Sequence, residues 1–177
     1  MEILESHVIW EGKWRVRVNT VRLADGANHN RAVIEHPGAV VLAPLVTTES
    51  GAPALLMVRQ YRLALGTTLF ELPAGTREPD EPWLQCAQRE LREETGFRAA
   101  EMTPLGEIWP APGFTDERMA LFLATGLTPD PLPMDIDEDI VVETWPLAEL
   151  AAMAIDGRLE DAKSVVSVLR AVHHLSQ

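Results

Sequence analysis

GTREPDEPWLQCAQRELREETGF, residues 75–97, predicts one helix with a loop on each side, from about Pro82 to Thr95. Asp80 or Glu81 can cap this helix, and Pro82 fits its first turn, where a missing N–H costs nothing. Gly96 fits just past the end, because a glycine tolerates the left-handed backbone that closes many helices. Apolar residues at four-residue spacing give the helix a core-facing side: Trp83, Ala87 and Leu91.

Three glutamates of the predicted helix, Glu90, Glu93 and Glu94, stand at i, i+3 and i+4 and therefore share one face. Glu90 and Glu94 are like charges one turn apart, which destabilises an isolated helix. A divalent cation removes that repulsion, and carboxylate oxygens are the hard ligands that Mg²⁺ prefers. Arg89 lies four residues before Glu93 and can pair with it. Taken alone, RELREE (89–94) is more typical of an ordinary solvated helix face than of a metal site.

The segments around this helix predict strands. GAVVLAPLV (38–46) is a nearly continuous apolar run suited to a buried strand, and two more strands follow it at ALLMVRQY (54–61) and TTLFEL (67–72). Later strands are expected at 105–109, 118–124 and 140–145, and helices at 147–155 and 161–175. Interleaved strands and helices imply an α/β (α+β) fold, a layered α/β/α domain with a mixed sheet.

Residues 1–36 are expected to form a small separate antiparallel sheet. Trp14, Val16 and Val18 alternate with Arg15 and Arg17, as in a half-exposed strand. Asp25-Gly26 marks a turn, and Pro37-Gly38 marks the boundary with a second unit, residues 37–177.

Composition limits the classes of function. The chain has 177 residues, 46% of them hydrophobic, which suits one compact domain with a core. Its formal net charge of −12 disfavours nucleic acid and anionic membranes as partners, and an anionic substrate would need local positive charge. The single cysteine, Cys86, excludes an internal disulfide, and no apolar run is long enough to cross a bilayer. These features, with a first segment unlike a secretory signal, favour a cytoplasmic location.

The helix and its loops match a known motif, GX5EX7REUXEEXGU, in which U is apolar. All nine specified positions agree: Gly75, Glu81, Arg89, Glu90, Leu91, Glu93, Glu94, Gly96 and Phe97. The chain thus resembles the Nudix hydrolases. The resemblance implies that Glu90, Glu93 and Glu94, with the carbonyl of Ala74, bind Mg²⁺, or alternatively Mn²⁺. It also implies that Gly75, Glu81, Arg89 and Gly96 hold the motif together.

Other segments resemble one subfamily, the ADP-ribose pyrophosphatases. These segments are EHPGA (35–39), VRQYR (58–62), ELPAG (71–75), PGFTDE (112–117) and GRLEDAKSV (157–165). Pro112 stands fifteen residues after Phe97, where that subfamily places a proline. The resemblance covers roughly residues 31 to 172 and implies hydrolysis of ADP-ribose to AMP and ribose 5-phosphate.

Candidate substrate contacts follow from residue type and resemblance. Arg59 and Arg62 end an apolar strand, and arginine forks suit phosphate oxygens, although strand-end solvation is the alternative. By resemblance, Arg31 and Glu35 can contact the adenine or its ribose, including across a homodimer that exchanges N-terminal strands. Phe114 is either a packing residue or a wall for the base, with packing preferred.

The catalytic base is expected in the acidic loop DIDED (135–139), since the subfamily often takes its base from a loop after the motif. Ile136 occupies the place where a relative carries a glutamate, so Glu138 is the choice, with Glu93 as alternative; simple solvation of this loop is the competing interpretation. Residues expected to be structural are the core aromatics Trp109 and Trp145, the small core residue Cys86, and the helix-end histidines His173 and His174.

Two rival functions remain open from the sequence. The first keeps the chemistry but changes the substrate to another nucleotide sugar or a dinucleotide, such as GDP-mannose, NADH or a diadenosine compound. The second is an inactive nucleotide-binding module, which is disfavoured because no motif carboxylate is missing.

Overall fold

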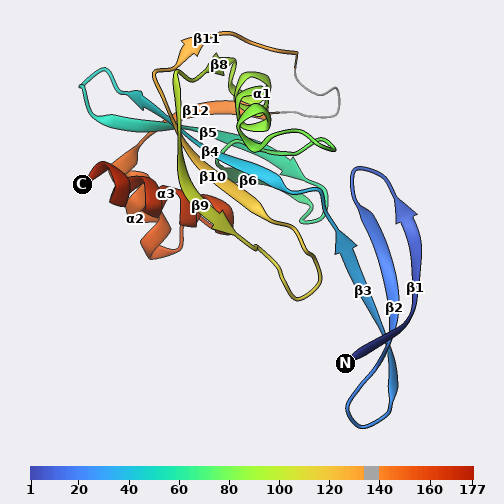
Figure 1. Ribbon diagram of the computed structural model, residues 1–177. Coiled ribbons are helices and arrows are strands. Elements are labelled where there is room, and N and C mark those ends of the chain that lie inside the picture. The colour runs from blue at the N-terminus through green and yellow to red at the C-terminus, as the bar shows by residue number, and fades with distance from the viewer. Residues whose placement is uncertain (134–139) are drawn as a thin grey trace.

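A computed structural model describes residues 1–133 and 140–177 (Figure 1). The strands before the first helix are β1 (Glu2–Glu11), β2 (Arg15–Arg22), β3 (Asn28–Glu35), β4 (Ala39–Thr47), β5 (Pro53–Arg62), β6 (Thr67–Glu71) and β7 (Ala74–Thr76). Helix α1 (Trp83–Thr95) precedes β8 (Phe97–Arg98), β9 (Glu101–Ile108), β10 (Met119–Thr125), β11 (Thr128–Pro129) and β12 (Ile140–Pro146). The chain ends in α2 (Leu147–Asp156) and α3 (Ala162–Leu175).

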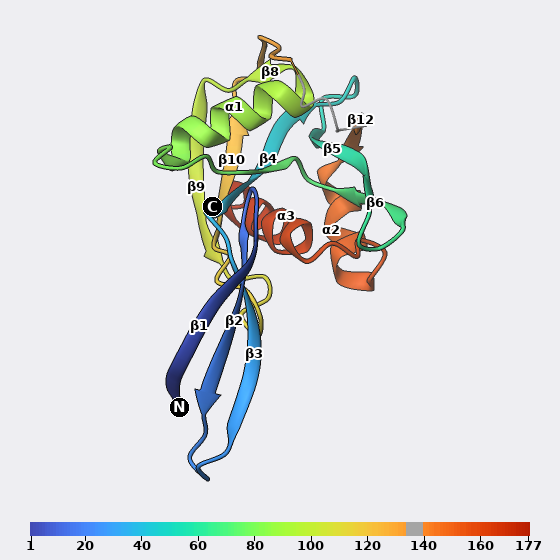
Figure 2. The ribbon, with the colours of Figure 1, turned by 90° about the vertical axis from the view of Figure 1, so that its right-hand side faces the viewer.

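The central sheet is mixed and has the order β12-β5-β4-β10-β9, with β6 paired to β5 and β7 paired to β4. The pair β4–β10 is parallel and the other pairs are antiparallel. Helix α1 covers one face of this sheet, while α2 and α3 cover the other (Figure 2). The predicted layered α/β/α domain is therefore confirmed.

Strand β4 shows why the apolar run at 39–43 is continuous. Val41 and Ala43 belong to the core cluster under α2 and α3, whereas Val40 and Leu42 belong to the cluster under α1. Because successive side chains of a strand point to opposite faces, a strand covered on both faces needs apolar residues at every position. In the described part of the chain, no helix is both long and apolar enough to cross a membrane.

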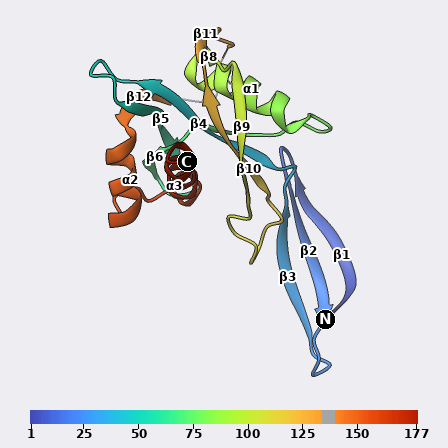
Figure 3. The same ribbon diagram turned by 60° about the vertical axis from the view of Figure 1, so that its left-hand side comes forward.

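Strands β1, β2 and β3 form a separate three-stranded antiparallel sheet, which we call the arm (residues 2–35). The arm projects away from the central sheet, as Figures 1 and 3 show. Val21 is its only buried residue. Backbone contacts join the end of β3 to the loop before β10: Ile34 N–H donates to the Phe114 carbonyl over 2.8 Å, and Asp116 N–H donates to the Ile34 carbonyl.

Two details differ from the sequence-based expectations. The N-cap of α1 is Pro82, without a side-chain cap, because Asp80 adopts a positive φ of 61° and Glu81 turns back to Arg89. Trp109 is 60% exposed and is not a core aromatic, since β9 ends at Ile108 and the chain then leaves the sheet. Trp145 packs edge-on to Phe70 beside the core, as expected.

Candidate active site

Arg89 is at the centre of the hydrogen bonds that join helix α1 to the segment before it. Its guanidinium donates to both carboxylate oxygens of Glu81 at 2.9 Å, to Glu90 at 2.7 Å and to Glu93 at 2.8 Å. It also donates to the carbonyl of Thr76 in β7 over 3.2 Å. The hydrogen bond to Glu81, above all, raises the pKa of Arg89, while the same contact lowers the pKa of Glu81. The predicted pairing of Arg89 with Glu93 is confirmed, and one cation orients three acidic side chains.

The carboxylates of Glu90 and Glu94 lie against the backbone of β7. Glu90 is only 7% exposed and Glu94 only 2%. The N–H of Ala74 donates to Glu94 Oε2 over 3.1 Å, and a Cβ atom at position 75 would lie 1.8 Å from Cδ of Glu90. Gly75 is therefore required for this contact, because any side chain there would displace the Glu90 carboxylate.

The donor set fits a hard divalent cation, although its atoms are not gathered around one point. Three carboxylates and the Ala74 carbonyl offer only oxygen ligands, as Mg²⁺ requires. Across 1–133 and 140–177, no group of three or more His, Cys, Asp or Glu side chains is arranged to hold a metal ion. Arg89 lies between Glu90 and Glu93 and forms an ion pair with each of them.

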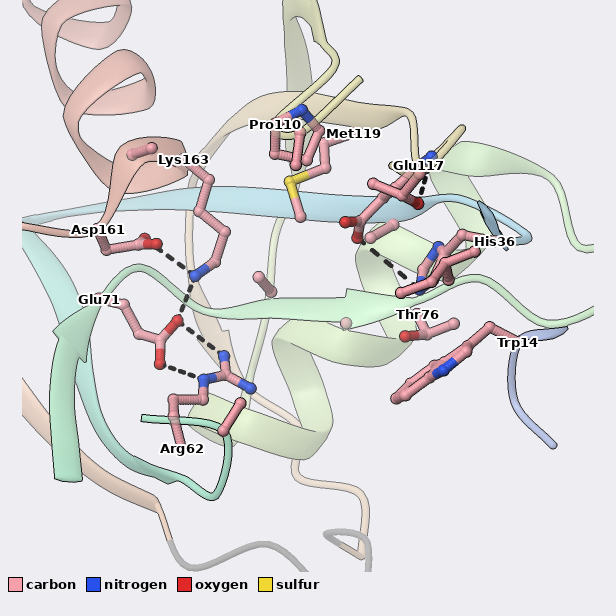
Figure 4. A pocket seen from close by; sticks show the side chains of 18 of the residues that line it. Trp14, His36, Arg62, Glu71, Thr76, Pro110, Glu117, Met119, Asp161 and Lys163 are labelled. Atoms are coloured by element: carbon pink, nitrogen blue, oxygen red, sulfur yellow. Dashed lines mark hydrogen bonds and ion pairs between the residues drawn. The ribbon is translucent and has the colours of Figure 1, made fainter. Parts of the chain in front are cut away.

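A pocket of about 510 Å³ lies beside this motif and is called the central pocket (Figure 4). Its floor includes the backbone of β7, Ala74 to Thr76. Its walls come from β3 and the start of β4, the loop 110–117, the β5–β6 hairpin, the start of α3, and Trp14 of the arm. Segments far apart in sequence thus meet over the strand that contacts the motif glutamates.

One end of the central pocket is apolar and aromatic. Trp14 stacks on His36 with ring centroids 5.9 Å apart, and Ile34 and the half-exposed Phe114 lie nearby in the same wall. Such flat apolar surfaces suit a nucleobase. Phe114 is 55% exposed, so the preferred interpretation of it as a packing residue is wrong.

His36 is fixed by three contacts. Its backbone N–H donates to Asp116 over 2.8 Å, and its Nδ1 accepts from the N–H of Gly38 over 3.1 Å. The ring proton therefore belongs on Nε2, which faces the Glu117 carboxylate at 3.8 Å. Burial lowers the pKa of His36 against the opposing effect of Glu117 and Asp116. The ring is thus held neutral under Trp14.

The other end of the central pocket is charged (Figure 4). Arg62 donates from Nε and Nη2 to the two oxygens of Glu71, both at 2.7 Å. Lys163 donates to the same Glu71 carboxylate and, over 2.9 Å, to Asp161. Glu71 is completely buried, so its charge is compensated by two cations rather than by water.

The structure brings some of the predicted site residues together and leaves others apart. Arg62, Phe114, Ala74 and Gly75 line the central pocket. Arg59 instead pairs with Glu143 over 2.6 Å and lies over the Phe70 ring, outside the pocket lining.

The remaining predictions fall on the arm or outside the described residues. Arg31 is exposed on β3, and Glu35 forms an ion pair with Arg17 over 2.6 Å. Gly96 ends α1 with a φ of 77°, as expected from the sequence. Glu138 and the rest of its acidic loop, 135–139, lie outside the described residues.

Several aromatic or ionisable residues of the pocket were not selected from the sequence, among them Trp14, His36, Glu71 and Lys163. His36, Glu71 and Lys163 occur inside the segments EHPGA, ELPAG and GRLEDAKSV, which were noticed only as resemblances. That resemblance was the available signal, since no spacing within one element connects these positions. The sequence predicted Trp14 only as one position of an alternating strand and did not indicate that it lines a pocket.

The chain is similar to known proteins over most of its length. The NUDIX domain family matches residues 36–167. The chain is 37% identical to the ADP-ribose pyrophosphatase of Bacillus subtilis (strain 168), over 85% of this chain and 80% of that protein. It is 36% identical to the ADP-ribose pyrophosphatase of Mycobacterium tuberculosis (strain ATCC 25618 / H37Rv), over 97% and 83%.

A solved structure shares the fold. The crystal structure of an ADP compounds hydrolase superposes with a TM-score of 0.82 at 24% identity, covering 98% of this chain and 93% of that one.

Proposed function

The chain belongs to the Nudix hydrolase family, and on that premise we propose that it hydrolyses the diphosphate of ADP-ribose to AMP and ribose 5-phosphate. The observation that carries the proposal is the placement of Glu90 and Glu94 against β7, the strand that floors the central pocket. A diphosphate lying on that floor would be next to the only motif carboxylates buried in the described chain.

Glu90, Glu93 and Glu94, with the carbonyl of Ala74, are the residues that would hold Mg²⁺ or Mn²⁺. When bound, such a cation offsets the charge of the phosphoryl oxygens and favours attack by water. Arg89 donates to one oxygen of Glu90 and to one oxygen of Glu93, which holds these two side chains beside each other on α1.

The two ends of the central pocket would bind different parts of the substrate. Trp14, His36 and Phe114 offer flat surfaces to the adenine, and Arg62 offers its guanidinium to a phosphate. A compact source of positive charge is needed there because the chain as a whole carries −12.

The reaction needs one water and one base. Water attacks one phosphorus, the bridging P–O bond at that phosphorus breaks, and the proton of the water passes to a carboxylate. We assign that base to Glu138, which lies outside the described residues, with Glu93 as the alternative on α1.

A homodimer formed through the arm is part of the proposal. The arm buries almost no apolar side chain, which leaves an isolated three-stranded sheet with little to stabilise it. It exposes several large apolar side chains: Ile3, Val8, Ile9 and Trp10. A second copy would cover them and would bring its Arg31 and Glu35 toward the base.

The test is turnover of a Glu94→Gln variant in Mg²⁺, with Glu149→Gln, an exposed residue of α2, as control. Loss of a ligand should lower kcat at least about a hundredfold, since even indirect partners of a metal ligand cost 10- to 100-fold. Undiminished turnover by Glu94→Gln would refute the metal assignment.

A substrate panel tests the substrate itself. We expect kcat/KM to be highest for ADP-ribose among ADP-ribose, GDP-mannose, NADH and diadenosine compounds, with AMP as product. Labelled water then shows which phosphorus is attacked. A higher kcat/KM for another compound would identify that compound, instead of ADP-ribose, as the substrate. Tight binding without AMP release would indicate an inactive binding module.

A further inference from the structure

Lys163 occupies a position that local physics disfavours. It lies in the first turn of α3, where the positive end of the helix dipole repels a cation. It is also only 8% exposed, and lysine is almost never buried to that degree without a specific partner. An alanine or a serine would suit the helix better, so the reason for a lysine must lie outside the helix.

A hydrogen-bond network holds the ammonium group of Lys163 in one place. Asp161 caps α3 by accepting from the Ser164 N–H over 3.0 Å, and it also accepts from Lys163. The hydroxyl of Ser164 accepts from the N–H of Leu72 over 2.7 Å. This network ties the start of α3 to the segment between β6 and β7, directly at the pocket floor.

The network leaves donor capacity on the pocket side. An ammonium group has three N–H bonds, and Glu71 and Asp161 take two of them. Within 1–133 and 140–177, the hydrogen bonds of Arg62 use Nε and Nη2, so Nη1 remains for another partner. Both side chains line the central pocket, and Figure 4 shows them converging on Glu71 from opposite sides.

The charges of this cluster balance. Arg62 and Lys163 supply two positive charges, and Glu71 and Asp161 supply two negative charges. The cluster therefore offers N–H donors to a phosphate without adding a net negative charge of its own, in a chain whose total charge is strongly negative.

We propose that Lys163 is a further substrate-binding residue, which forms with Arg62 a two-cation subsite for one phosphate of the nucleoside diphosphate. Glu71 is the positioning residue that holds both cations at the pocket wall. This inference rests on the proposed function, because it assumes that the ligand of the central pocket is a nucleoside diphosphate.

The experiment measures binding of ADP-ribose, AMP and adenosine by calorimetry in EDTA, so that no metal contributes. Lys163→Met should bind ADP-ribose and AMP at least about tenfold more weakly than the unaltered chain, the loss expected for one charge-assisted hydrogen bond. Adenosine, which has no phosphate, should bind equally to both. Lys163→Arg should recover part of the lost affinity.

The control is Arg158→Met, which removes the same charge from an exposed ion pair with Asp156 shortly before α3. It should leave all three affinities unchanged. Equal ADP-ribose affinity in Lys163→Met and the unaltered chain would overturn the inference, and so would a parallel loss for adenosine, which indicates a merely structural role.

A second measurement uses the unaltered chain, so its outcome does not depend on whether a variant folds. Lys13 and Lys163 are the only lysines of the sequence, so ¹³C labelling at the ε carbon of lysine gives two resonances. AMP should shift the Lys163 resonance and adenosine should not; equal spectra with both ligands would refute the contact. Hydrolysis of ADP-ribose by the unaltered chain is judged separately, so the inference can fail while the proposed function stands.

Discussion

At the scale of the residue, His36 links three parts of the molecule. Its ring lies under Trp14 of the arm, faces Glu117 in the loop 110–117, and accepts from Gly38 just before β4. Its side chain is 9% exposed, and burial is the main cause of its lowered pKa. The folded chain therefore prefers the neutral ring.

This preference predicts a pH dependence of stability. The unfolded chain binds a proton at His36 near the ordinary pKa of about 6.5, whereas the folded chain resists protonation until a lower pH. The stabilisation is fully present above about pH 6.5 and is lost as the pH falls through the lowered pKa. Urea unfolding at pH 7.5 and 5.5 should show a larger loss of unfolding free energy for the unaltered chain than for His36→Gln.

His29→Gln, at an exposed position of β3, provides the matched control and should retain the full pH dependence. An equal loss in His36→Gln and in the unaltered chain would contradict the role of burial at His36.

Residue types and spacing predicted some of this chemistry. The pairing of Arg89 with Glu93 followed from the geometry of one helix. The contact of Lys163 with Glu71 joins positions 92 residues apart, and each position belongs to a segment whose local pattern says nothing about the other. Only the packing of α3 against the sheet brings them together.

At the scale of the element, the packing of α1 against β7 depends on Gly75. A Cβ atom there would overlap the Glu90 carboxylate, which is buried and held by Arg89. Gly75→Ala should therefore displace Glu90 by an ångström or more and lower kcat by about a hundredfold, the usual order for such a displacement of a functional group. Turnover at saturating substrate, with Mg²⁺ titrated, measures the effect.

Gly113→Ala is the control for this variant, because nothing lies within 4 Å of a Cβ atom at position 113. It should retain normal turnover. Normal turnover in Gly75→Ala as well would show that Glu90 can leave β7 without consequence.

The elements themselves were largely predictable. The helix at 82–95 and the buried strand at 38–46 have strong periodic or continuous apolar patterns, and they occur within a few residues of the expected bounds. The cap was mispredicted because residue type cannot show that Asp80 has a positive φ. Trp109 was mispredicted because an aromatic next to a strand looks the same whether the chain continues or turns outward.

At the scale of the whole molecule, the arm is the part whose own buried contacts contribute least to its stability. It has one buried residue and a row of exposed apolar side chains, so its stability should depend on a second copy. Sedimentation velocity should show a dimer, and Ile9→Glu should raise its dissociation constant at least about tenfold, since a charge would be buried at the interface.

Ile155→Glu alters an even more exposed apolar residue at the end of α2 and should leave the dimer intact. A monomer of the unaltered chain at working concentration would remove the proposed contribution of Arg31 and Glu35 across a dimer.

The arm also contains one peptide bond that a lysine-specific endoproteinase should cleave in the folded chain. Of the two lysines, Lys163 is enclosed at the start of α3, whereas Lys13 is exposed in the tight connection between β1 and β2. A lysine-specific endoproteinase should therefore cut the native chain after Lys13 alone. The released peptide 1–13 would be retained only through its pairing with β2, and its rate of loss would report directly how firmly the edge of the arm is held.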